Sequence, residues 1–401
     1  MAGNVVYQKQ AVSQNGPKAG TKTEKKRHYY DFSLLLGLVI IFAIGLLIIF
    51  SSSQYTAMIE NGNPRYYLNK QLTYGGIGLA ACILISKIPY RIFRWRPFAW
   101  AIYAGSVGLL LLTLVMGLAS HGKTRWIQIG SFSFQPTEVA KAGLIMTMAY
   151  LITVFGKRLN KNFLFILVLV IACFPSFIVL SQNLSSGFIM IAITGIMLFI
   201  ATEKYLFLGS CFFMILGGMF FAKPVVRWAI ARSGNFERPE QYWLRRIVAW
   251  AYPEVFTDDA YQTTQGLYAI GSGGLTGRGL GESIQKFGKI PEVQNDMIFT
   301  VICEEFGFVG AVLIVLLYVF IIYRIYQIAK NAVDIYGQMI CIGVMAHISV
   351  QVILNIAVVT GVIPNTGVTL PFISYGGTAL MCTMAEIGLV LSVSNRIPLS
   401  E

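Results

Sequence analysis

The sequence contains little charge for its length. Of its 401 residues, only 12% are Asp, Glu, Lys or Arg, whereas 56% are hydrophobic and the mean hydropathy is +0.65. A water-soluble domain has about 25% charged residues, so this composition excludes an ordinary soluble fold. Long apolar runs recur along nearly the whole chain, and a run of about 18 residues can cross a bilayer as a helix. Because barrel strands alternate instead of running continuously apolar, the sequence predicts an all-α polytopic membrane protein.

Several common signatures are also missing. The chain has no CxxC pair, and no glycine spacing of the Walker or Rossmann type occurs in its strand–helix context. All six cysteines fall inside apolar runs, so no disulfide framework stabilises a polar loop, and we interpret them as small buried hydrophobes. They are Cys82, Cys173, Cys211, Cys303, Cys341 and Cys382. Residues 1–31 are polar and basic, and the first apolar run is too long for the core of a signal peptide.

The formal net charge is +13, which could indicate a nucleic-acid partner. The basic residues, however, cluster at the ends of the apolar runs. This distribution is typical of topology determinants in a membrane protein and not of a groove for phosphates. We therefore expect no nucleic acid among the partners.

Ten apolar runs are long enough to be membrane spans. We expect spans at 32–52, 70–88, 98–118, 136–155, 163–180, 185–202, 205–222, 297–322, 336–360 and 375–394. Ser181–Ser186 is only a brief interruption, so the fifth and sixth runs could also be counted as one. Merging them would move Arg324 and Lys330 to the opposite side of the membrane from the other basic residues, so ten spans are preferred.

The positive-inside rule orients the chain. One set of short connections holds most of the basic residues, namely Lys22, Lys25, Lys26, Arg27, Arg91, Arg94, Arg96, Lys157, Arg158, Lys161, Arg324, Lys330 and Arg396. The opposite short loops hold chiefly Arg65, Lys70, Lys123 and Arg125. Both termini are therefore expected in the cytoplasm. The resulting organisation is a disordered basic cytoplasmic tail (1–31), a ten-span domain (32–396) with a large extracytoplasmic loop (223–296), and a short cytoplasmic tail (397–401).

Two charged residues lie at the start of the fourth run. Pro136 suits the first turn of a helix, and Glu138 and Lys141 are three residues apart on one helical face. They are either an intrahelical ion pair that allows both charges near lipid depth, or functional groups, as charges inside membranes usually are. Arg125 precedes them in the same outward-facing connection.

The long loop carries a glycine-rich stretch, GSGGLTGRGLG, between Arg246 and Lys286. Repeated glycines allow positive φ and close backbone approach, and exposed amides beside cations can hold a phosphate. A flexible surface loop is the alternative interpretation.

Asp296 ends the long loop where the eighth run begins. It is either an N-cap favoured by the helix dipole or a carboxylate that takes a proton from a substrate hydroxyl. Glu304 and Glu305 follow inside the run, where they need partners or a polar cavity.

The last two runs are separated by PNTGVTLPFISYGG. Its two prolines and three glycines break helical structure, and irregular backbone at membrane depth is tolerated only when it is buried in protein or lines a cavity. Ser374 and Gly376 are therefore expected at the lip of a central site, with a rigid turn as the alternative.

Taken in order, four motifs resemble the SEDS family (shape, elongation, division and sporulation), which comprises FtsW- and RodA-type proteins. The motifs are RWIQIGSFSFQPTEVAK, YQTTQGLYAIGSGGLTGRGLGESIQK, PEVQNDMIFTVICEEFGFVG and TGVTLPFISYGGT. The resemblance extends over about 32–396 in family order.

The resemblance implies a ten-span bacterial membrane fold and a peptidoglycan glycosyltransferase. Such an enzyme polymerises lipid II, the undecaprenyl-pyrophosphate disaccharide-pentapeptide, on the outer face of the cytoplasmic membrane. The family usually works with a class B penicillin-binding protein and with other divisome or elongasome membrane proteins. It also implies Mg²⁺ or Mn²⁺ but no organic cofactor, although the sequence contains no ligand cluster that establishes a metal.

The family motifs assign roles to several residues. Asp296 matches the family's essential aspartate, and Lys286, Arg125, Glu138 and Lys141 also fall on motif positions. The family's GYQ corresponds to Ala260, Tyr261 and Gln262. This chain departs from the family at Gln294-Asn295, where His-Thr is common, and at NLSS, where the family has a segment like PDLGT.

The implied reaction joins sugars by a β-1,4 linkage with inversion at an α-linked pyrophosphate. We expect Asp296 to be the general base and Lys286, Arg246 and Arg125 to stabilise the leaving pyrophosphate. A lipid II flippase and a non-catalytic scaffold for the transpeptidase are the alternatives. TGVTLPFISYGGT and the segment YYDFS favour the division type, which would act at the septum, with elongation and sporulation types open.

Overall fold

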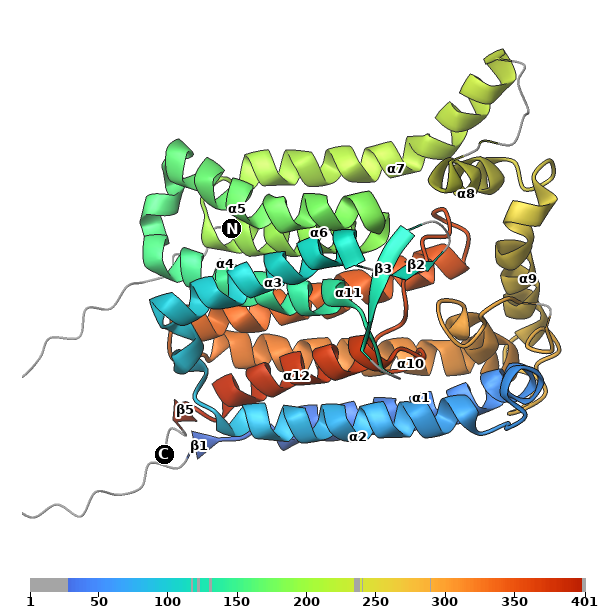
Figure 1. The fold of residues 1–401 in the computed structure, drawn as a ribbon, viewed down its shortest axis with the longest axis horizontal. Helices are drawn as coiled ribbons and strands as arrows, with labels where there is room; N and C mark the ends of the chain where they lie inside the picture. Colours follow the sequence, from blue (N-terminus) through green and yellow to red (C-terminus); the bar gives the residue numbers. More distant parts are fainter. Residues whose placement is uncertain are drawn as a thin grey trace, which may run out of the picture.

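The computed structural model describes residues 28–116, 118–120, 123–129, 132–233, 239, 241–288 and 290–398. Most of the predicted tail over 1–31 therefore lies outside the described residues. The described chain is dominated by long helices that run side by side (Figure 1). They are α1 (Phe32–Asn61), α2 (Tyr66–Lys87), α3 (Arg96–Met116), α4 (Pro136–Phe155), α5 (Asn162–Gln182), α6 (Leu184–Ala201), α7 (Tyr205–Ser233), α10 (Ile298–Lys330), α11 (Ile335–Val359) and α12 (Gly377–Ser394).

Each predicted span corresponds to one of these helices. Within the described residues, eight are long and apolar enough to cross a membrane, namely α1, α3, α4, α5, α6, α10, α11 and α12. A ninth span results when the two halves of α7, which are bent by 47°, are taken together. The predicted second span, α2, is the exception because its first turns carry Asn69, Lys70 and Gln71. The all-α polytopic fold is thus confirmed, with eight or nine helices that pass this test in place of ten.

Local sequence explains where several helices begin. Asn183 separates α5 from α6, and its side chain accepts a hydrogen bond from the Ser186 amide, so the fifth and sixth runs are indeed two helices. Pro136 occupies the first turn of α4, as predicted. The α1 helix continues past its apolar run until Gly62, whose left-handed φ of 64° ends it with an amide bond to Met58.

Short strands and 3-10 helices lie in the connections between the long helices. The connection after α3 forms a small antiparallel sheet of β2 (Leu118–Ser120), β3 (Lys123–Ile129) and β4 (Phe132–Phe134). The 3-10 helices η1 (Tyr90–Arg94) and η2 (Gly156–Asn160) carry basic residues at one end of the bundle (Figure 1). The sequence did not predict the small sheet, because its strands are too short to give a clear alternating pattern.

The two described ends of the chain meet at that same end of the bundle. β1 (His28–Tyr29) pairs with β5 (Ile397–Pro398). Asp31 caps α1 through the Leu34 amide at 2.9 Å and pairs with Arg324 of α10 at 2.7 Å. The two described ends of the chain therefore lie side by side at one end of the bundle.

The helix α10 is broken at Gly307, which has φ 66°. The glycine-rich segment after α9 (Thr257–Gly273) fills the break. Amides of Arg278 and Gly279 donate to the carbonyls of Glu304 and Glu305, and amides after the break donate back to Gly274 and Leu275, all at 2.9–3.1 Å. The glycine-rich stretch is therefore a tightly packed structural element and not a flexible surface loop.

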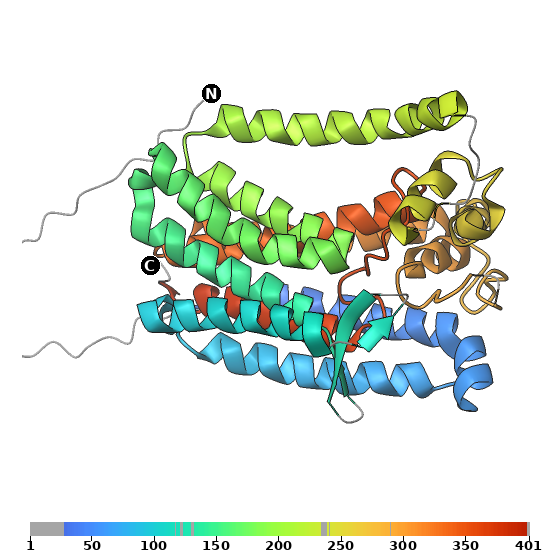
Figure 2. The same ribbon diagram turned by 45° about the horizontal axis from the view of Figure 1, so that its top comes forward.

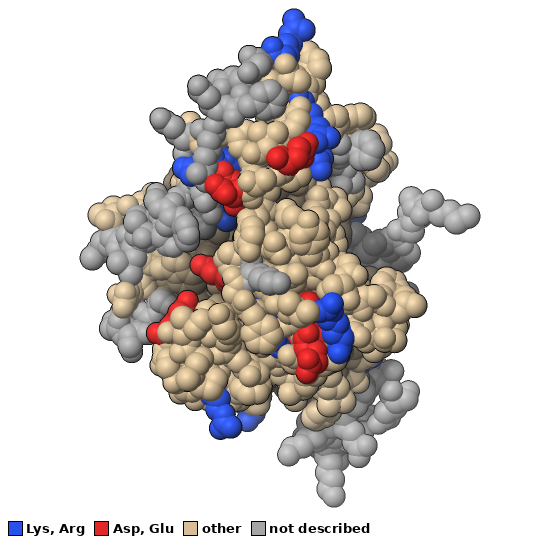
Figure 3. All heavy atoms as spheres, turned by 90° about the vertical axis from the view of Figure 1, so that its right-hand side faces the viewer, with Lys and Arg blue, Asp and Glu red and all other residues tan. Residues whose placement is uncertain are grey.

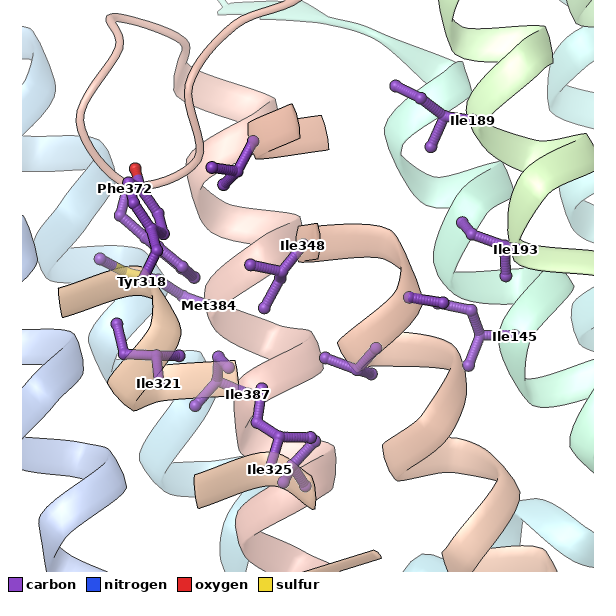
Figure 4. Packing of buried hydrophobic residues seen from close by; sticks show 14 of the residues in the cluster. Ile145, Ile189, Ile193, Tyr318, Ile321, Ile325, Ile348, Phe372, Met384 and Ile387 are labelled. Atoms are coloured by element: carbon purple, nitrogen blue, oxygen red, sulfur yellow. The ribbon is translucent and has the colours of Figure 1, made fainter. Parts of the chain in front are cut away.

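The core lies between α4, α6, α10, α11 and α12. Figure 4 shows Ile145, Ile189 and Ile193 on one side of α11 and Tyr318, Ile321 and Ile387 on the other. Tyr318 also donates a hydrogen bond to the carbonyl of Pro371, which fixes the Pro/Gly-rich turn above the core.

The opposite end of the bundle carries α8 (Tyr242–Ala251) and α9. Seen from another angle, α7 stands apart from the other helices and reaches this end (Figure 2). Figure 3 views the end directly and shows a largely uncharged surface with small separate groups of cations and carboxylates. Candidate residues of the predicted long loop are thus gathered at one end of a rigid bundle.

Gly277 provides a test of how tightly the glycine-rich segment packs into the break in α10. It has φ 79°, and a methyl group there would overlap the carbonyl of Glu305. We expect Gly277→Ala to lower the free energy of unfolding by about 2–4 kcal/mol, because left-handed strain and overpacking add. Thermal unfolding in detergent measures this loss. Gly271→Ala, a site with open space around it, is the control, and equal stability of the two variants would contradict the packing.

Candidate functional site

Asp296 lies between the turns that follow α9 and the start of α10. The N-cap of α10 is Met297, which makes no side-chain cap bond, so Asp296 is not a helix cap. Its backbone carbonyl accepts a hydrogen bond from Asn355 of α11 at 2.8 Å, and the same amide donates to Val368 at 2.6 Å. Asn355 thereby ties Asp296 to the Pro/Gly-rich turn.

The Asp296 carboxyl is 7% exposed. Burial raises its pKa to about 6, the Arg246 guanidinium opposes that rise, and Glu292 adds to it. A carboxyl with this pKa changes protonation state near neutral pH, which suits a general base better than an ordinary surface aspartate does.

Arg246 of α8 and Asp296 face the same point. Arg246 donates through Nη1 to the carbonyl of Asn365 at 3.0 Å. A methyl group on Gly367 would lie 3.8 Å from both Arg246 Nη1 and Asp296 Oδ2. Gly367 has φ 71°, so the turn both requires glycine and leaves space between the two charged groups.

Gln262 of α9 completes this group. Its side-chain amide donates to the Pro291 carbonyl at 3.0 Å and lies 3.5 Å from Asp296 Oδ1, and its oxygen accepts from Asn365 at 2.8 Å. The structure therefore brings together three predicted site residues from separate elements. Tyr261, by contrast, is 43% exposed, and within the described chain no hydrogen bond joins it to this group.

Lys286 belongs to a different cluster. Its Nζ donates to Glu305 at 2.8 Å, to Ser51 at 2.9 Å and to the Gly281 carbonyl at 2.8 Å. With its side chain 4% exposed and all three donors used, Lys286 holds the loop against α1 and α10. The sequence predicted that Lys286 binds pyrophosphate, whereas the structure pairs it with Glu305.

Glu138 and Lys141 form the predicted ion pair, at 2.8 Å and fully buried. The pair continues into residues that were not predicted. Lys141 Nζ lies 3.3 Å from the Gln351 side-chain oxygen. The ring of His347 hydrogen-bonds to Gln351 at 2.9 Å and to Glu386 at 2.7 Å. An ionisable residue in an apolar run was the available signal for His347 and Glu386, because such groups need partners inside a membrane.

Ser374 and Gly376 shape the turn before α12. The Ser374 hydroxyl accepts from the Leu370 amide at 2.7 Å, and its carbonyl accepts from Gln71 of α2 at 3.1 Å. Gln351 donates to Thr369 of the same turn at 3.0 Å. The turn is therefore fixed from below by the buried polar network and from the side by α2.

Two expectations remain predictions. Arg125 lies in β3, but its side chain is outside the described part of the structure. The described residues contain no group of three or more His, Cys, Asp or Glu side chains able to hold a metal ion. Asp296 has the Gln262 amide, the Arg246 guanidinium and the Glu292 carboxylate as neighbours, and the Mg²⁺ or Mn²⁺ ion stays a prediction.

Comparison with known proteins agrees with this architecture. Residues 32–397 match the model of the cell cycle protein family FtsW/RodA/SpoVE. Stage V sporulation protein E of Bacillus subtilis is 33% identical over 373 residues, covering 91% of this chain and 96% of that protein. A probable peptidoglycan glycosyltransferase FtsW of Trichlorobacter lovleyi is 33% identical over 378 residues, covering 92% and 94%. The chain belongs to the FtsW/RodA/SpoVE family.

Solved structures share the fold. The rod shape determining protein RodA of Thermus thermophilus superposes with a TM-score of 0.63 at 24% identity, covering 92% of this chain and 98% of that one. A chain from a peptidoglycan synthase complex that coordinates polymerization and crosslinking gives a TM-score of 0.69 at 24% identity, covering 91% and 97%.

The buried pair of Lys286 and Glu305 yields a stability prediction. We expect Lys286→Met to cost about 3–5 kcal/mol, because it leaves a buried carboxylate without its cation. The double variant Lys286→Met, Glu305→Gln should recover much of this loss. Thermal unfolding in detergent compares them, with the exposed Lys330→Met as control. A single variant as stable as wild type would show that the pair is not structural.

Proposed function

We propose that this chain is a peptidoglycan glycosyltransferase that polymerises lipid II into β-1,4-linked glycan, with Asp296 as its general base. The observation that carries the proposal is the buried Asp296 carboxyl facing the Arg246 guanidinium across Gly367. Full-length similarity to relatives named probable peptidoglycan glycosyltransferases supports the reaction class.

The acceptor 4-hydroxyl is a weak nucleophile, so a base that removes its proton accelerates the reaction by about 10²–10⁴-fold. The Asp296 carboxylate accepts that proton as the oxygen attacks C1 of the donor sugar. Gln262 and Asn355 hold the aspartate in position through its side chain and its backbone. Inversion at C1 follows from a single displacement of the α-linked pyrophosphate.

The leaving pyrophosphate gains negative charge as its bond to C1 breaks. A fixed cation beside the reacting centre stabilises that charge. Arg246 is the cation whose charge acts on Asp296, and its bond to Asn365 fixes its orientation. Lys286 is already engaged by Glu305, so the proposal assigns this step to Arg246.

The proposed setting is the bacterial cytoplasmic membrane, with both termini in the cytoplasm and the Asp296 end outside. Basic residues of η1 and η2 at the end where β1 and β5 pair support this orientation. A class B penicillin-binding protein is the proposed partner, supported by the similarity to a chain of a peptidoglycan synthase complex.

Replacing the base tests the proposal directly. We expect Asp296→Asn to reduce polymerisation of purified lipid II by about 10²–10⁴-fold, because an amide cannot accept the proton. Glycan length is resolved on a gel, with the protein reconstituted with its transpeptidase. Asp258→Asn, an exposed aspartate in the first turn of α9, is the matched control.

Other outcomes have definite meanings. Equal product from wild type and Asp296→Asn would remove this residue from the mechanism. An intact wild-type complex that makes no glycan but moves labelled lipid II across proteoliposomes would support a flippase instead.

The pKa of Asp296 predicts how the polymerisation rate falls at low pH. Only the ionised carboxylate is a base, so activity should be full well above pH 6, half-maximal at about pH 6 and lost as the pH falls further. The negative charge of Glu292 raises this pKa, so Glu292→Gln should move the midpoint to lower pH. Initial rates across a pH series measure both midpoints. An unchanged midpoint in Glu292→Gln would argue that another group controls the limb.

A further inference from the structure

Buried polar side chains from three helices form a chain of hydrogen bonds beneath the Pro/Gly-rich turn. They are Lys141 of α4, His347 and Gln351 of α11, and Glu386 of α12, and each is at most 4% exposed. Lys141 Nζ and His347 Nε2 both contact Gln351 Oε1, at 3.3 and 2.9 Å. His347 Nδ1 lies 2.7 Å from Glu386 Oε2.

The orientation of the Gln351 amide determines which atoms carry hydrogens. Its nitrogen faces the Thr369 carbonyl at 3.0 Å, and a carbonyl can only accept. Its oxygen faces the Lys141 ammonium, which can only donate. The amide therefore cannot be reversed, and His347 must carry a hydrogen on Nε2 in order to bond to the same oxygen.

The other ring nitrogen of His347 then requires a second proton. At 2.7 Å, Nδ1 and Glu386 Oε2 cannot meet as two lone pairs. Either the imidazole is doubly protonated and paired with a carboxylate, or a neutral Glu386 acid donates to Nδ1. In both forms the pair is neutral as a whole, which suits its burial within a bundle of membrane helices. In both forms, Nε2 donates to Gln351.

Gln351 connects this pair to the turn, where it holds the Thr369 carbonyl. Thr369 is two residues after Gly367, the glycine beside both the Asp296 carboxyl and the Arg246 guanidinium. Without the imidazole, the amide oxygen would keep only one donor, at 3.3 Å. The amide would then hold the turn less firmly, close to the point where the proposed base and cation face each other.

We propose that His347, with its proton-sharing partner Glu386, is a positioning residue for the reaction, an inference that rests on the proposed function. By donating to Gln351, it fixes the turn and thereby the relative orientation of Asp296 and Arg246. His347 touches no reacting atom, so its loss should lower kcat and leave KM for lipid II nearly unchanged. A purely structural pair would matter only for stability.

Two double variants separate positioning from stability. His347→Leu with Glu386→Leu, the leucine pair, removes the hydrogen-bond chain, and apolar replacement of a buried pair is often neutral for stability. His347→Gln with Glu386→Gln, the glutamine pair, keeps the chain, because one amide accepts from the other and donates to Gln351. We expect the leucine pair to lower kcat about 10- to 100-fold, since small displacements of reacting groups cost this much. The glutamine pair should recover most of the rate.

The assay measures polymerisation of lipid II by each variant reconstituted with its transpeptidase, after thermal unfolding in detergent has shown that it is folded. Thr194→Val is the control, because this buried hydroxyl bonds to the Met190 carbonyl of its own helix, and it should polymerise as wild type. If the leucine pair does not fold, His347→Asn with Glu386→Gln replaces it, since the shorter amide cannot reach Gln351. Equal kcat with and without the chain would overturn the positioning role, as would a loss confined to KM.

Amide hydrogen exchange of the turn, measured without substrate, separates this proposal from the proposed function. Exchange in residues 364–376 should be faster in the leucine pair than in the glutamine pair or wild type, because the turn opens more readily. That difference in a complex that makes no glycan would uphold the positioning of the turn while rejecting the glycosyltransferase proposal. Equal exchange in all three proteins would overturn the positioning role.

Discussion

The break in α10 is the constraint on which the outer end of the molecule depends. A helix interrupted at Gly307 leaves carbonyls and amides without their usual partners, and such groups are costly inside a membrane protein. Here the glycine-rich segment after α9 supplies the missing partners through four backbone hydrogen bonds in both directions. A methyl group at Gly273 or Gly277 would overlap the backbone of α10, which explains why glycine occupies these two positions.

This packed segment divides the charged residues into two groups with different properties. Lys286 and Glu305 neutralise each other where the segment meets α1 and α10. Asp296 and Arg246 of α8 are instead held by amides and backbone carbonyls around the open space at Gly367. The Lys286–Glu305 pair makes the surrounding framework rigid. Such a framework keeps Asp296 and Arg246 in a fixed geometry when substrate binds.

Sequence patterns predicted much of the fold, because apolar length alone defines a helix in a membrane. Pro136 correctly marked a helix start, and the interruption at Ser181–Ser186 correctly separated two spans. Asp296, Arg246 and Gln262 were predicted as site residues, and the structure brings them together. The sequence could not predict which polar side chains pair across helices. Lys286, for example, was predicted to bind an anion, because its partners Glu305 and Ser51 lie on other elements. The same applies to His347 and Glu386, which lie 39 positions apart.

The isolation of α7 has a consequence for how the enzyme senses its surroundings. None of its described side chains is fully buried, and Arg227 joins its outer part to the Ala251 carbonyl and to Glu254. A helix in that situation adjusts its tilt to the thickness of the bilayer. Lys223 of α7 lines a cavity of about 370 Å³ together with Arg246 and Asn365, so a change in the tilt of α7 would change the width of that cavity. Membrane thickness is thereby expected to act on this end of the molecule through hydrophobic mismatch.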